Sequence, residues 1–216
     1  MDQITIILAT RNRQEKLARM LASVPCRLWL EVWVICDGDP FTYTWLQSGV
    51  FPCVTRVELL ASQSGAVHAR NFLSADVDDG LLYATDDIVF LPNAIDNALQ
   101  AFNKCFSDDD GVVGFKQNQP HHLAGVALVG QRFLQRYPRK QLFYPGYFHF
   151  ACQEIYWLSL SLKRWHYEEE ALINHFHPSS NHTYMDQTHT DARIHRERDH
   201  QLITSRQSRG EVWGAA

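Results

Sequence analysis

The sequence of 216 residues lacks the patterns that mark several classes of protein. Its five cysteines are widely spaced, odd in number and without a CxxC pair, so neither a disulfide framework nor a zinc knuckle is expected. No apolar run approaches the roughly 18 residues that cross a membrane, and the first residues show no signal-peptide pattern. A phosphate loop of the GxGxxG or GxxxxGK type is also missing, which disfavours nucleotidyl transfer. These absences lead us to expect a cytoplasmic protein from a reducing compartment.

Charge of either sign is not in large excess. Twenty Lys and Arg residues stand against 24 Asp and Glu residues, which gives a formal net charge of -4. Such a chain has no global field that would attract nucleic acid. The charges are unevenly distributed, however, because residues 76–110 hold nine Asp and one Lys, whereas residues 193–209 hold five Arg. Any binding of a polyanion must therefore be local.

What the sequence does contain is a regular alternation of strand and helix patterns. With 45% hydrophobic residues, the chain is long enough to bury the core of a single domain. Short apolar runs predict strands at residues 4–9, 30–36, 53–60, 81–85, 111–117 and 125–130. Helical patterns fall at residues 14–24, 66–75, 93–106 and 152–165. This alternation predicts an α/β fold with a mostly parallel sheet flanked by helices.

Polar segments follow three of the predicted strands at the point where each strand ends. They read TRNR at residues 10–13, DGDP at 37–40 and TDD at 85–87, and the composition of DGDP predicts a turn. Because ligands of a doubly wound sheet bind at the carboxyl ends of its strands, we expect these segments to converge on one crevice. A buried unpaired carboxylate is strongly disfavoured, so we expect a cation or a hydrogen-bond donor beside Asp86 and Asp87. The alternative is a solvated turn or a helix N-cap.

Four segments together resemble a known family. In chain order they are TIILATRNRQEKLARMLASV, VICDGDP, GAVHARNFLSA and LLYATDDIVFLPNAI. They resemble the nucleotide-sugar-binding half of a family 2 glycosyltransferase with the Rossmann-like GT-A fold, and GYFHFACQEIYW and ALINHFHPS resemble its later segments more loosely. The resemblance implies one GT-A domain over residues 1–216, with a nucleotide-sugar-binding half at 1–110 and an acceptor-side half and tail at 111–216. It also implies metal-dependent, inverting transfer from a UDP-type sugar donor to an acceptor hydroxyl.

The resemblance implies the following donor contacts. Thr10, Arg11 and Asn12 would line the nucleotide pocket, with Arg13 nearby. The side chains of Asp37, Arg70 and Asp86 would meet the rest of the nucleoside. Asp37 would accept the N–H of a uracil base, Arg70 would lie beside base or ribose, and Asp86 would contact ribose or a metal-bound water. Otherwise Arg11 and Arg13 are surface charges and Asp37 begins a turn.

The same resemblance implies a divalent metal ion, Mn²⁺ or Mg²⁺, on oxygen ligands with some help from imidazole. Asp87 would bind the ion directly, and a histidine of NHFHP would complete its shell. We favour His177 over His175, because the proline that follows His177 disfavours helix there. The alternative is that one of the two packs against nearby aromatic residues. The remaining histidines in polar segments are expected in loops or on the surface: His121, His122, His182, His189, His195 and His200.

On the acceptor side, the resemblance assigns the general base to Glu154 at the start of the predicted helix. Cys152 stands where a further acid is expected; otherwise Glu154 is an ordinary first-turn helix acid. Aromatic residues precede and enter this helix and would stack on a sugar or a nucleobase, or simply pack: Tyr144, Tyr147, Phe148, His149, Phe150, Tyr156 and Trp157. The acceptor would be a glycan, a small molecule or a modified DNA base. Two alternatives are a transferase acting on hydroxylated bases in DNA and a nucleotide-sugar-binding module without catalysis, and the Arg-rich tail is expected to close over the donor.

Overall fold

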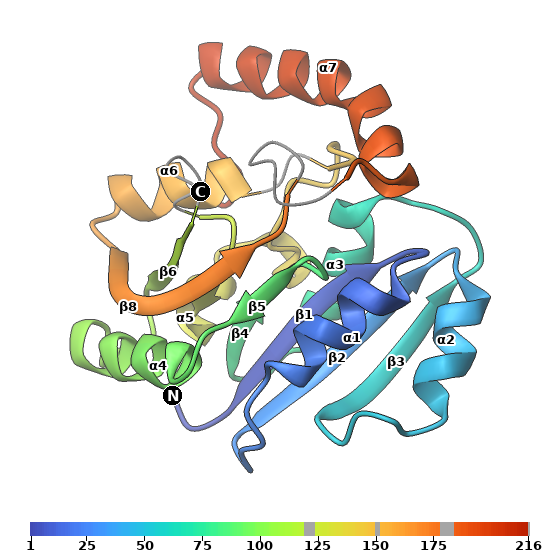
Figure 1. The fold of residues 1–216 in the computed structure, drawn as a ribbon. Helices are drawn as coiled ribbons and strands as arrows, with labels where there is room; N and C mark the ends of the chain where they lie inside the picture. Colours follow the sequence, from blue (N-terminus) through green and yellow to red (C-terminus); the bar gives the residue numbers. More distant parts are fainter. Residues whose placement is uncertain (119–123, 150–151, 178–183, 216) are drawn as a thin grey trace.

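The computed structural model describes residues 1–118, 124–149, 152–177 and 184–215, and these residues fold around an eight-stranded sheet (Figure 1). Phe150, His121, His122 and His182 lie outside the described residues. The strands are β1 (Ile4–Thr10), β2 (Leu30–Asp37), β3 (Val54–Leu60), β4 (Gly80–Tyr83), β5 (Ile88–Phe90), β6 (Val112–Gln117), β7 (Ala127–Val129) and β8 (Trp165–His175). Their spatial order is β3-β2-β1-β4-β7-β6-β8-β5.

The sheet has a parallel block and a mixed block. The strands β3, β2, β1 and β4 run parallel, and the β1–β2 register extends from Ile4 opposite Leu30 to Thr10 opposite Cys36. In the mixed block β7 is antiparallel to β4 and β6, β6 is parallel to β8, and β5 is antiparallel to β8. Four of the seven strand pairs found among the described residues are therefore parallel, and the predicted α/β fold is confirmed.

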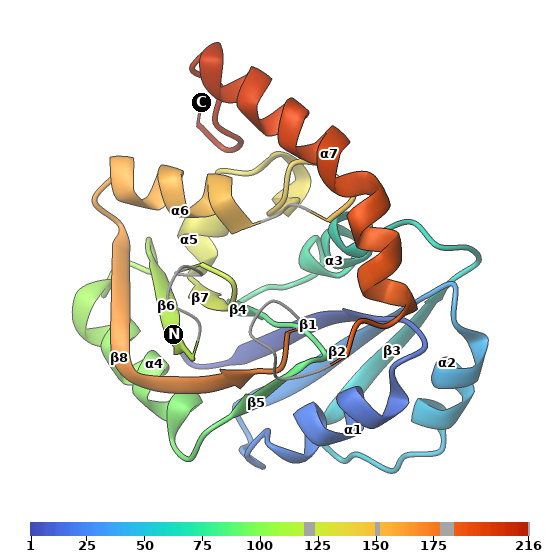
Figure 2. The same cartoon turned by 45° about the horizontal axis from the view of Figure 1, so that its top comes forward.

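Helices cover both faces of the sheet, which explains why its central strands read as continuous apolar runs. The helices are α1 (Gln14–Ala22), α2 (Pro40–Gln47), α3 (Ala66–Ser74), α4 (Ala94–Cys105), α5 (Gln131–Leu134), α6 (Cys152–Ser161) and α7 (Gln187–Ser208), with a 3-10 turn η1 (Pro138–Lys140). Ile6 and Leu8 of β1 pack into the core cluster shared with α1 and α4, whereas Ile7 points into the cluster shared with α3 and α6. Figure 2 shows α1 and α2 on one side of β1–β3 and α3 on the other.

Two helices arise where the sequence was expected to form a turn or a polar tail. The predicted turn DGDP instead begins α2, because the Asp39 carboxylate accepts the Thr42 N–H at 3.0 Å and Pro40 takes the first helical position. The polar tail contains the 22-residue α7, capped by Asp186, whose carboxylate accepts the His189 N–H at 3.0 Å. The short β5 and the long β8 were also not predicted. Both α2 and α7 therefore begin at an aspartate N-cap.

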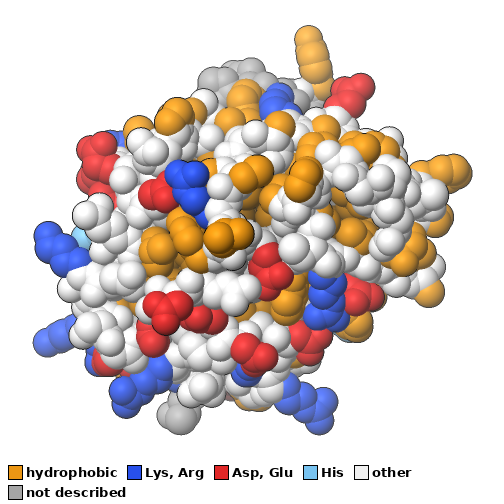
Figure 3. All heavy atoms as spheres, turned by 90° about the horizontal axis from the view of Figure 1, so that it is seen from below, with side chains coloured by type: hydrophobic (Ala, Val, Ile, Leu, Met, Phe, Trp, Pro, Cys, Tyr) orange, Lys and Arg blue, Asp and Glu red, His pale blue; other side chains and the backbone are white. Residues whose placement is uncertain are grey.

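The outer surface shows neither a membrane-spanning helix in the described ranges nor, on the face in Figure 3, a segregation of charge. None of the helices in the described ranges is both long and apolar enough to cross a membrane. On the face turned away from α7, acidic and basic side chains are interspersed (Figure 3). That face therefore carries no concentrated basic surface in its described part. The two predicted halves contribute strands to one sheet, and their separate roles stay a prediction.

Candidate functional site

A cavity of about 540 Å³ lies at the carboxyl ends of β1, β2 and β4, a size typical of small-molecule sites. Its walls also include the start of α3, the loop before α6, the end of β8 and the first turns of α7. Seven of the residues predicted for the site line it: Thr10, Arg11, Asp37, Arg70, Asp86, Asp87 and His177. Asn12 and Glu154 do not. Asn12 has a left-handed backbone (φ 53°), and its N–H donates to Asp39 at 2.7 Å on the α2 side.

Asp86 is held by the segment that follows β1. Its two carboxylate oxygens accept hydrogen bonds from Thr10 Oγ1 at 2.8 Å and from an Arg13 guanidinium nitrogen at 2.9 Å. Burial raises the pKa of Asp86 above its usual value, although the charge of Arg13 opposes this. Thr10, predicted to touch the nucleotide, therefore also anchors the acidic turn between β4 and β5.

Asp87 lies between two imidazoles. His175 Nε2 is 3.3 Å from Asp87 Oδ1, and His189 Nε2 is 3.6 Å from Asp87 Oδ2. Asp87 Oδ1 and His189 Nε2 are nevertheless buried without an aligned hydrogen-bond partner among the described residues. Burial alone would raise the pKa of Asp87, but the two imidazoles and Arg13 outweigh it and hold the pKa well below its usual range. Asp87 is thus a buried, ionised carboxylate with an oxygen available to a ligand.

The first turn of α7 is fixed to the segment after β1 by an ion-pair cluster. Arg13 donates to both carboxylate oxygens of Asp186, at 2.9 and 2.7 Å, and Lys16 Nζ donates to the same group at 2.6 Å. Burial would raise the pKa of Asp186, but these cations lower it below its usual range. Next to this cluster, Arg11 donates to Asp191 at 2.8 Å. The polar tail therefore lies at the cavity, as part of a helix.

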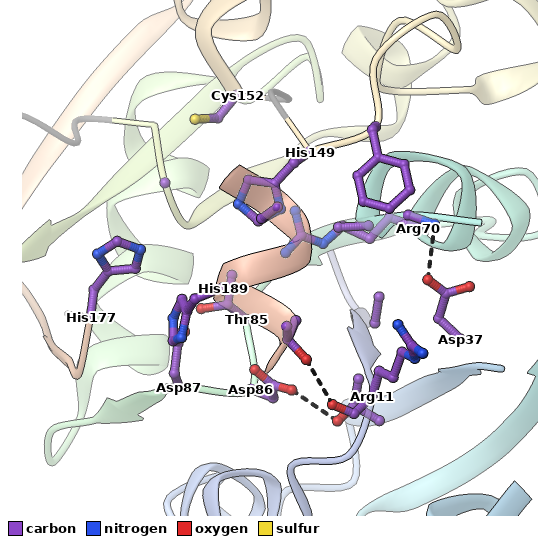
Figure 4. Close-up of a pocket in the computed structure, with 18 of the residues that line it drawn as sticks. Arg11, Asp37, Arg70, Thr85, Asp86, Asp87, His149, Cys152, His177 and His189 are labelled. Carbon is purple, nitrogen blue, oxygen red and sulfur yellow. Dashed lines mark hydrogen bonds and ion pairs between the residues drawn. The ribbon is translucent and has the colours of Figure 1, made fainter. Parts of the chain in front are cut away.

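Asp37 and Arg70 lie on the α3 side of the cavity (Figure 4). Asp37 accepts the N–H groups of Ser64 and Gly65, at 2.7 and 2.9 Å, and the Ser64 hydroxyl at 2.9 Å. A uracil N–H would have to share this carboxylate with those donors. Arg70 is buried, which lowers its pKa, and its Nε has no hydrogen-bond partner among the described residues.

His149 and Cys152 face Asp86 and Asp87 across the cavity (Figure 4). The His149 side chain lines the cavity and is exposed in this structure. Partial desolvation by the surrounding protein, together with the charge of Arg70, lowers the pKa of His149 to about 4. Burial raises the pKa of the Cys152 thiol. Both groups are therefore neutral at physiological pH.

Glu154 lies behind the cavity wall, in a cluster of its own. Its carboxylate accepts hydrogen bonds from Arg206 at 2.9 and 3.1 Å, from the Tyr147 hydroxyl and from the Trp213 backbone N–H. The Glu154 side chain is 3% exposed, and none of the residues that donate to it lines the cavity. Its assignment as the general base stays a prediction that this arrangement does not favour.

The donors around Asp87 decide whether a divalent ion fits. The unpartnered Asp87 Oδ1 offers the carboxylate oxygen that Mn²⁺ and Mg²⁺ prefer, and His175 or His189 lies close enough to Asp87 to add a ring nitrogen. No three His, Cys, Asp or Glu side chains converge as a metal site within the described residues, and the two imidazoles face different oxygens of Asp87. The set thus fits an ion held by Asp87 and one imidazole, with further ligands from a bound molecule.

The sequence placed Arg13 only near the nucleotide pocket and His149 only in an aromatic cluster, and it gave Asp186 no role. His189 was expected in a loop or on the surface, but it is buried and faces Asp87. His177, favoured as the ligand, has its ring centroid 5.5 Å from that of His175 and 5.1 Å from that of His189. The signal that was available is the spacing of Asp186 and His189, an N-cap and the third residue of a helix.

Comparison with known proteins identifies the fold of this chain. No protein-family model and no curated protein matches the sequence. Among solved structures, S. aureus TarS matches with a TM-score of 0.60 and 12% identity over 80% of this chain and 36% of that one. TarS 1–349 in complex with UDP-GlcNAc matches with a TM-score of 0.53 and 13% identity over 65% of this chain and 51% of that one. GalNAc-T7 with UDP, GalNAc and Mn²⁺ matches with a TM-score of 0.65 and 12% identity over 80% of this chain and 43% of that one. This chain spans about half or less of those chains, and at such identities the likeness shows that it has the GT-A fold.

Proposed function

We propose that the chain is a glycosyltransferase that binds a nucleoside diphosphate sugar, with UDP as the favoured nucleotide, in this cavity. It transfers the sugar to an acceptor hydroxyl with inversion. The acceptor is a glycan, a small molecule or a modified DNA base. Acidic and basic side chains are interspersed on the face in Figure 3, so that face offers no basic surface for a DNA backbone.

One observation carries the proposal. Seven buried side-chain polar atoms have no hydrogen-bond partner among the described residues, and five of them belong to residues that line this cavity. They are Arg11 Nε, Arg70 Nε, Thr85 Oγ1, Asp87 Oδ1 and His189 Nε2. Native proteins leave few buried polar groups unpaired, so a cluster of them is best explained by a polar ligand that completes them.

The types of these groups suit a nucleoside diphosphate. Arg11 and Arg70 offer cationic N–H groups, which bind phosphate oxygens strongly. Asp37 and Thr10 lie at the ends of β2 and β1, where a GT-A fold would receive the base and ribose. Support for a UDP donor comes from the solved structures of TarS in complex with UDP-GlcNAc or with UDP, and of GalNAc-T7 with UDP, GalNAc and Mn²⁺.

A divalent ion would be held by Asp87 together with His175 or His189, and His177 stays a candidate through its contact with both rings. When bound, such an ion neutralises charge on the departing diphosphate. The role of the protein around it is to orient Asp87, which the imidazoles and Arg13 do from three sides.

The test is a thermal-shift titration with UDP, GDP and inorganic diphosphate, each with and without Mn²⁺. We expect UDP to raise the melting temperature most, because a ligand that binds only the native state stabilises it by mass action. Arg70→Gln should weaken UDP binding at least tenfold, about 1.4 kcal/mol. Arg193→Gln, an exposed position on α7, is the matched control. If no nucleotide shifts the wild-type transition, the proposed function is wrong.

A second candidate is a nucleotide-sugar-binding module without catalysis. It is favoured by the position of Glu154, whose carboxylate is occupied by Arg206 and does not line the cavity. The two candidates differ in turnover. Release of UDP from a bound UDP-sugar, measured by a coupled nucleotide assay, supports the enzyme; tight binding with no release supports the module.

A further inference from the structure

The carboxylates that line the cavity are held by other groups or assigned to the proposed ion. Asp37 accepts three hydrogen bonds from residues 64 and 65, and Asp86 accepts from Thr10 and Arg13. Asp87 faces two imidazoles, and its unpartnered Oδ1 is the oxygen assigned above to a divalent ion. Glu154 is paired with Arg206 behind the wall. Among the described residues that line the cavity, the acids thus leave the removal of a proton from an acceptor to another group.

His149 occupies the opposite wall, on the acceptor side, and its backbone is firmly held. Asp199 of α7, fully buried, accepts the N–H of Phe148 at 3.0 Å and the N–H of His149 at 2.8 Å. The Phe148 ring stacks on His195 with centroids 3.8 Å apart. A buried carboxylate is a costly way to fix a loop, and here it fixes the residue whose ring opens into the cavity.

Gly65 allows this loop to approach α3. Its φ is 94°, and a Cβ there would lie 2.7 Å from the carbonyl oxygen of Phe148. That oxygen accepts the Val67 N–H at 3.2 Å. The loop that carries His149 is therefore fixed from α3 on one side and from α7 on the other, which is the support that a reacting group requires.

The charges around His149 keep its ring neutral until a donor binds. Partial desolvation and the charge of Arg70 lower its pKa to about 4, Arg13 acts in the same direction, and Asp87 and Asp199 oppose them. A neutral imidazole has a nitrogen lone pair that can accept a proton. A diphosphate bound beside the arginines would cancel much of their charge, and this makes the imidazolium easier to form.

We infer that His149 is the general base of the transfer proposed above, and the inference rests on that proposed function. The acceptor oxygen forms a bond to the anomeric carbon of the sugar while the bond from that carbon to the diphosphate oxygen breaks. The electron pair of the broken bond leaves with the nucleoside diphosphate. The proton of the acceptor hydroxyl moves to the unprotonated ring nitrogen of His149.

The experiment uses water as the acceptor and measures UDP release from UDP-glucose, UDP-galactose, UDP-GlcNAc and UDP-GalNAc. We expect His149→Gln to lower the rate by about 10²-fold or more, the usual contribution of general base catalysis. The affinity for UDP, measured by calorimetry, should change less than threefold. His68→Gln, an exposed histidine on α3, is the matched control and should leave the rate unchanged.

A second variant separates chemistry from packing. His149→Ala leaves a space open to the cavity, and added imidazole should restore part of the UDP release in that variant alone. Unchanged release in His149→Gln, no rescue of His149→Ala, or no release by a wild-type protein that binds UDP would each overturn the assignment. Failure to bind UDP at all would instead overturn the proposed function, so the two failures are distinguishable.

Discussion

Two buried carboxylates, Asp87 in the cavity and Glu154 behind its wall, differ in how completely their oxygens are hydrogen-bonded. Glu154 receives hydrogen bonds from Arg206, Tyr147 and the Trp213 backbone and leaves no oxygen unpartnered. Asp87 has a buried oxygen without an aligned partner and faces His189, whose Nε2 also lacks one. A fully satisfied network stabilises a fold, whereas a partly satisfied one is arranged for something that is not yet bound. The two carboxylates, both predicted to act in one reaction, therefore have different tasks.

The largest effect should come from Glu154→Gln, which removes the charge that pairs with the buried Arg206. Breaking one partner of a buried ion pair leaves the other uncompensated and costs about 3–5 kcal/mol of unfolding free energy. Urea unfolding measures this loss. Glu197→Gln, exposed on the same helix α7, is the control and should change stability by less than about 0.5 kcal/mol.

A different outcome for Glu154 would reverse the comparison. If Glu154→Gln keeps the stability of the wild-type protein and abolishes UDP release, then Glu154 and Arg206 belong to the reacting site, which extends beyond the cavity walls seen in this structure. Because Glu154 is 3% exposed, such a result would require the cluster to open during turnover.

The intermediate effect should come from Asp87→Asn, which keeps the size of the side chain and removes its charge. We expect the part of UDP affinity that depends on Mn²⁺ to fall at least tenfold, about 1.4 kcal/mol. Calorimetry with and without Mn²⁺ measures it. Asp78→Asn is the control, since that side chain is 92% exposed and pairs only with Lys140. If the wild-type protein binds UDP with equal affinity in the presence and absence of Mn²⁺, the proposed metal site is wrong.

The smallest effect should come from Asp186→Asn, which keeps a helix N-cap but removes the charge that pairs with Arg13 and Lys16. Because Asp186 is partly exposed, the loss should be about 1 kcal/mol. The pKa of Asp186 is lowered by folding, so its stabilisation is complete above an unfolded pKa of about 4 and is lost as pH falls below that value.

Hydrogen exchange of the α7 amides at about pH 2.5 and pH 7 tests this prediction, because the first value lies below the unfolded pKa. Exchange rates, corrected for the intrinsic effect of pH, should show less protection at the lower pH than at pH 7 in the wild-type protein. The same comparison in Asp186→Asn should show a much smaller difference. Equal protection at both values in the wild-type protein would mean that the Arg13 cluster does not hold the helix.

The parallel half of the fold could be predicted because its information is local. Strands buried on both faces, such as residues 4–10, read as continuous apolar runs, and the polar residues at their ends marked the crevice. α2 was missed because Asp39 and Pro40 were interpreted as a turn, although the same residues also begin a helix. α7 was missed because its contacts at the cavity are polar and its few apolar residues, such as Ile203, form no continuous stripe in the sequence.

The site was predicted less completely than the fold, for a related reason. Thr10, Asp37, Asp86 and Asp87 follow strands and could be placed by position alone. The role of Glu154 could not, because the sequence does not show which face of α6 meets the cavity and which meets Arg206. His189 likewise depends on a pairing between the two ends of the chain.

The contact between Arg13 and Asp186 spans 173 positions of the chain. Pairings of such long range form late, because the entropy of closing the loop must be overcome before they contribute. The parallel block β3-β2-β1-β4 needs no residue beyond Tyr83, whereas the wall that α7 adds to the cavity needs residues 187–208. A nascent chain would thus form the floor of the cavity before the wall that closes it.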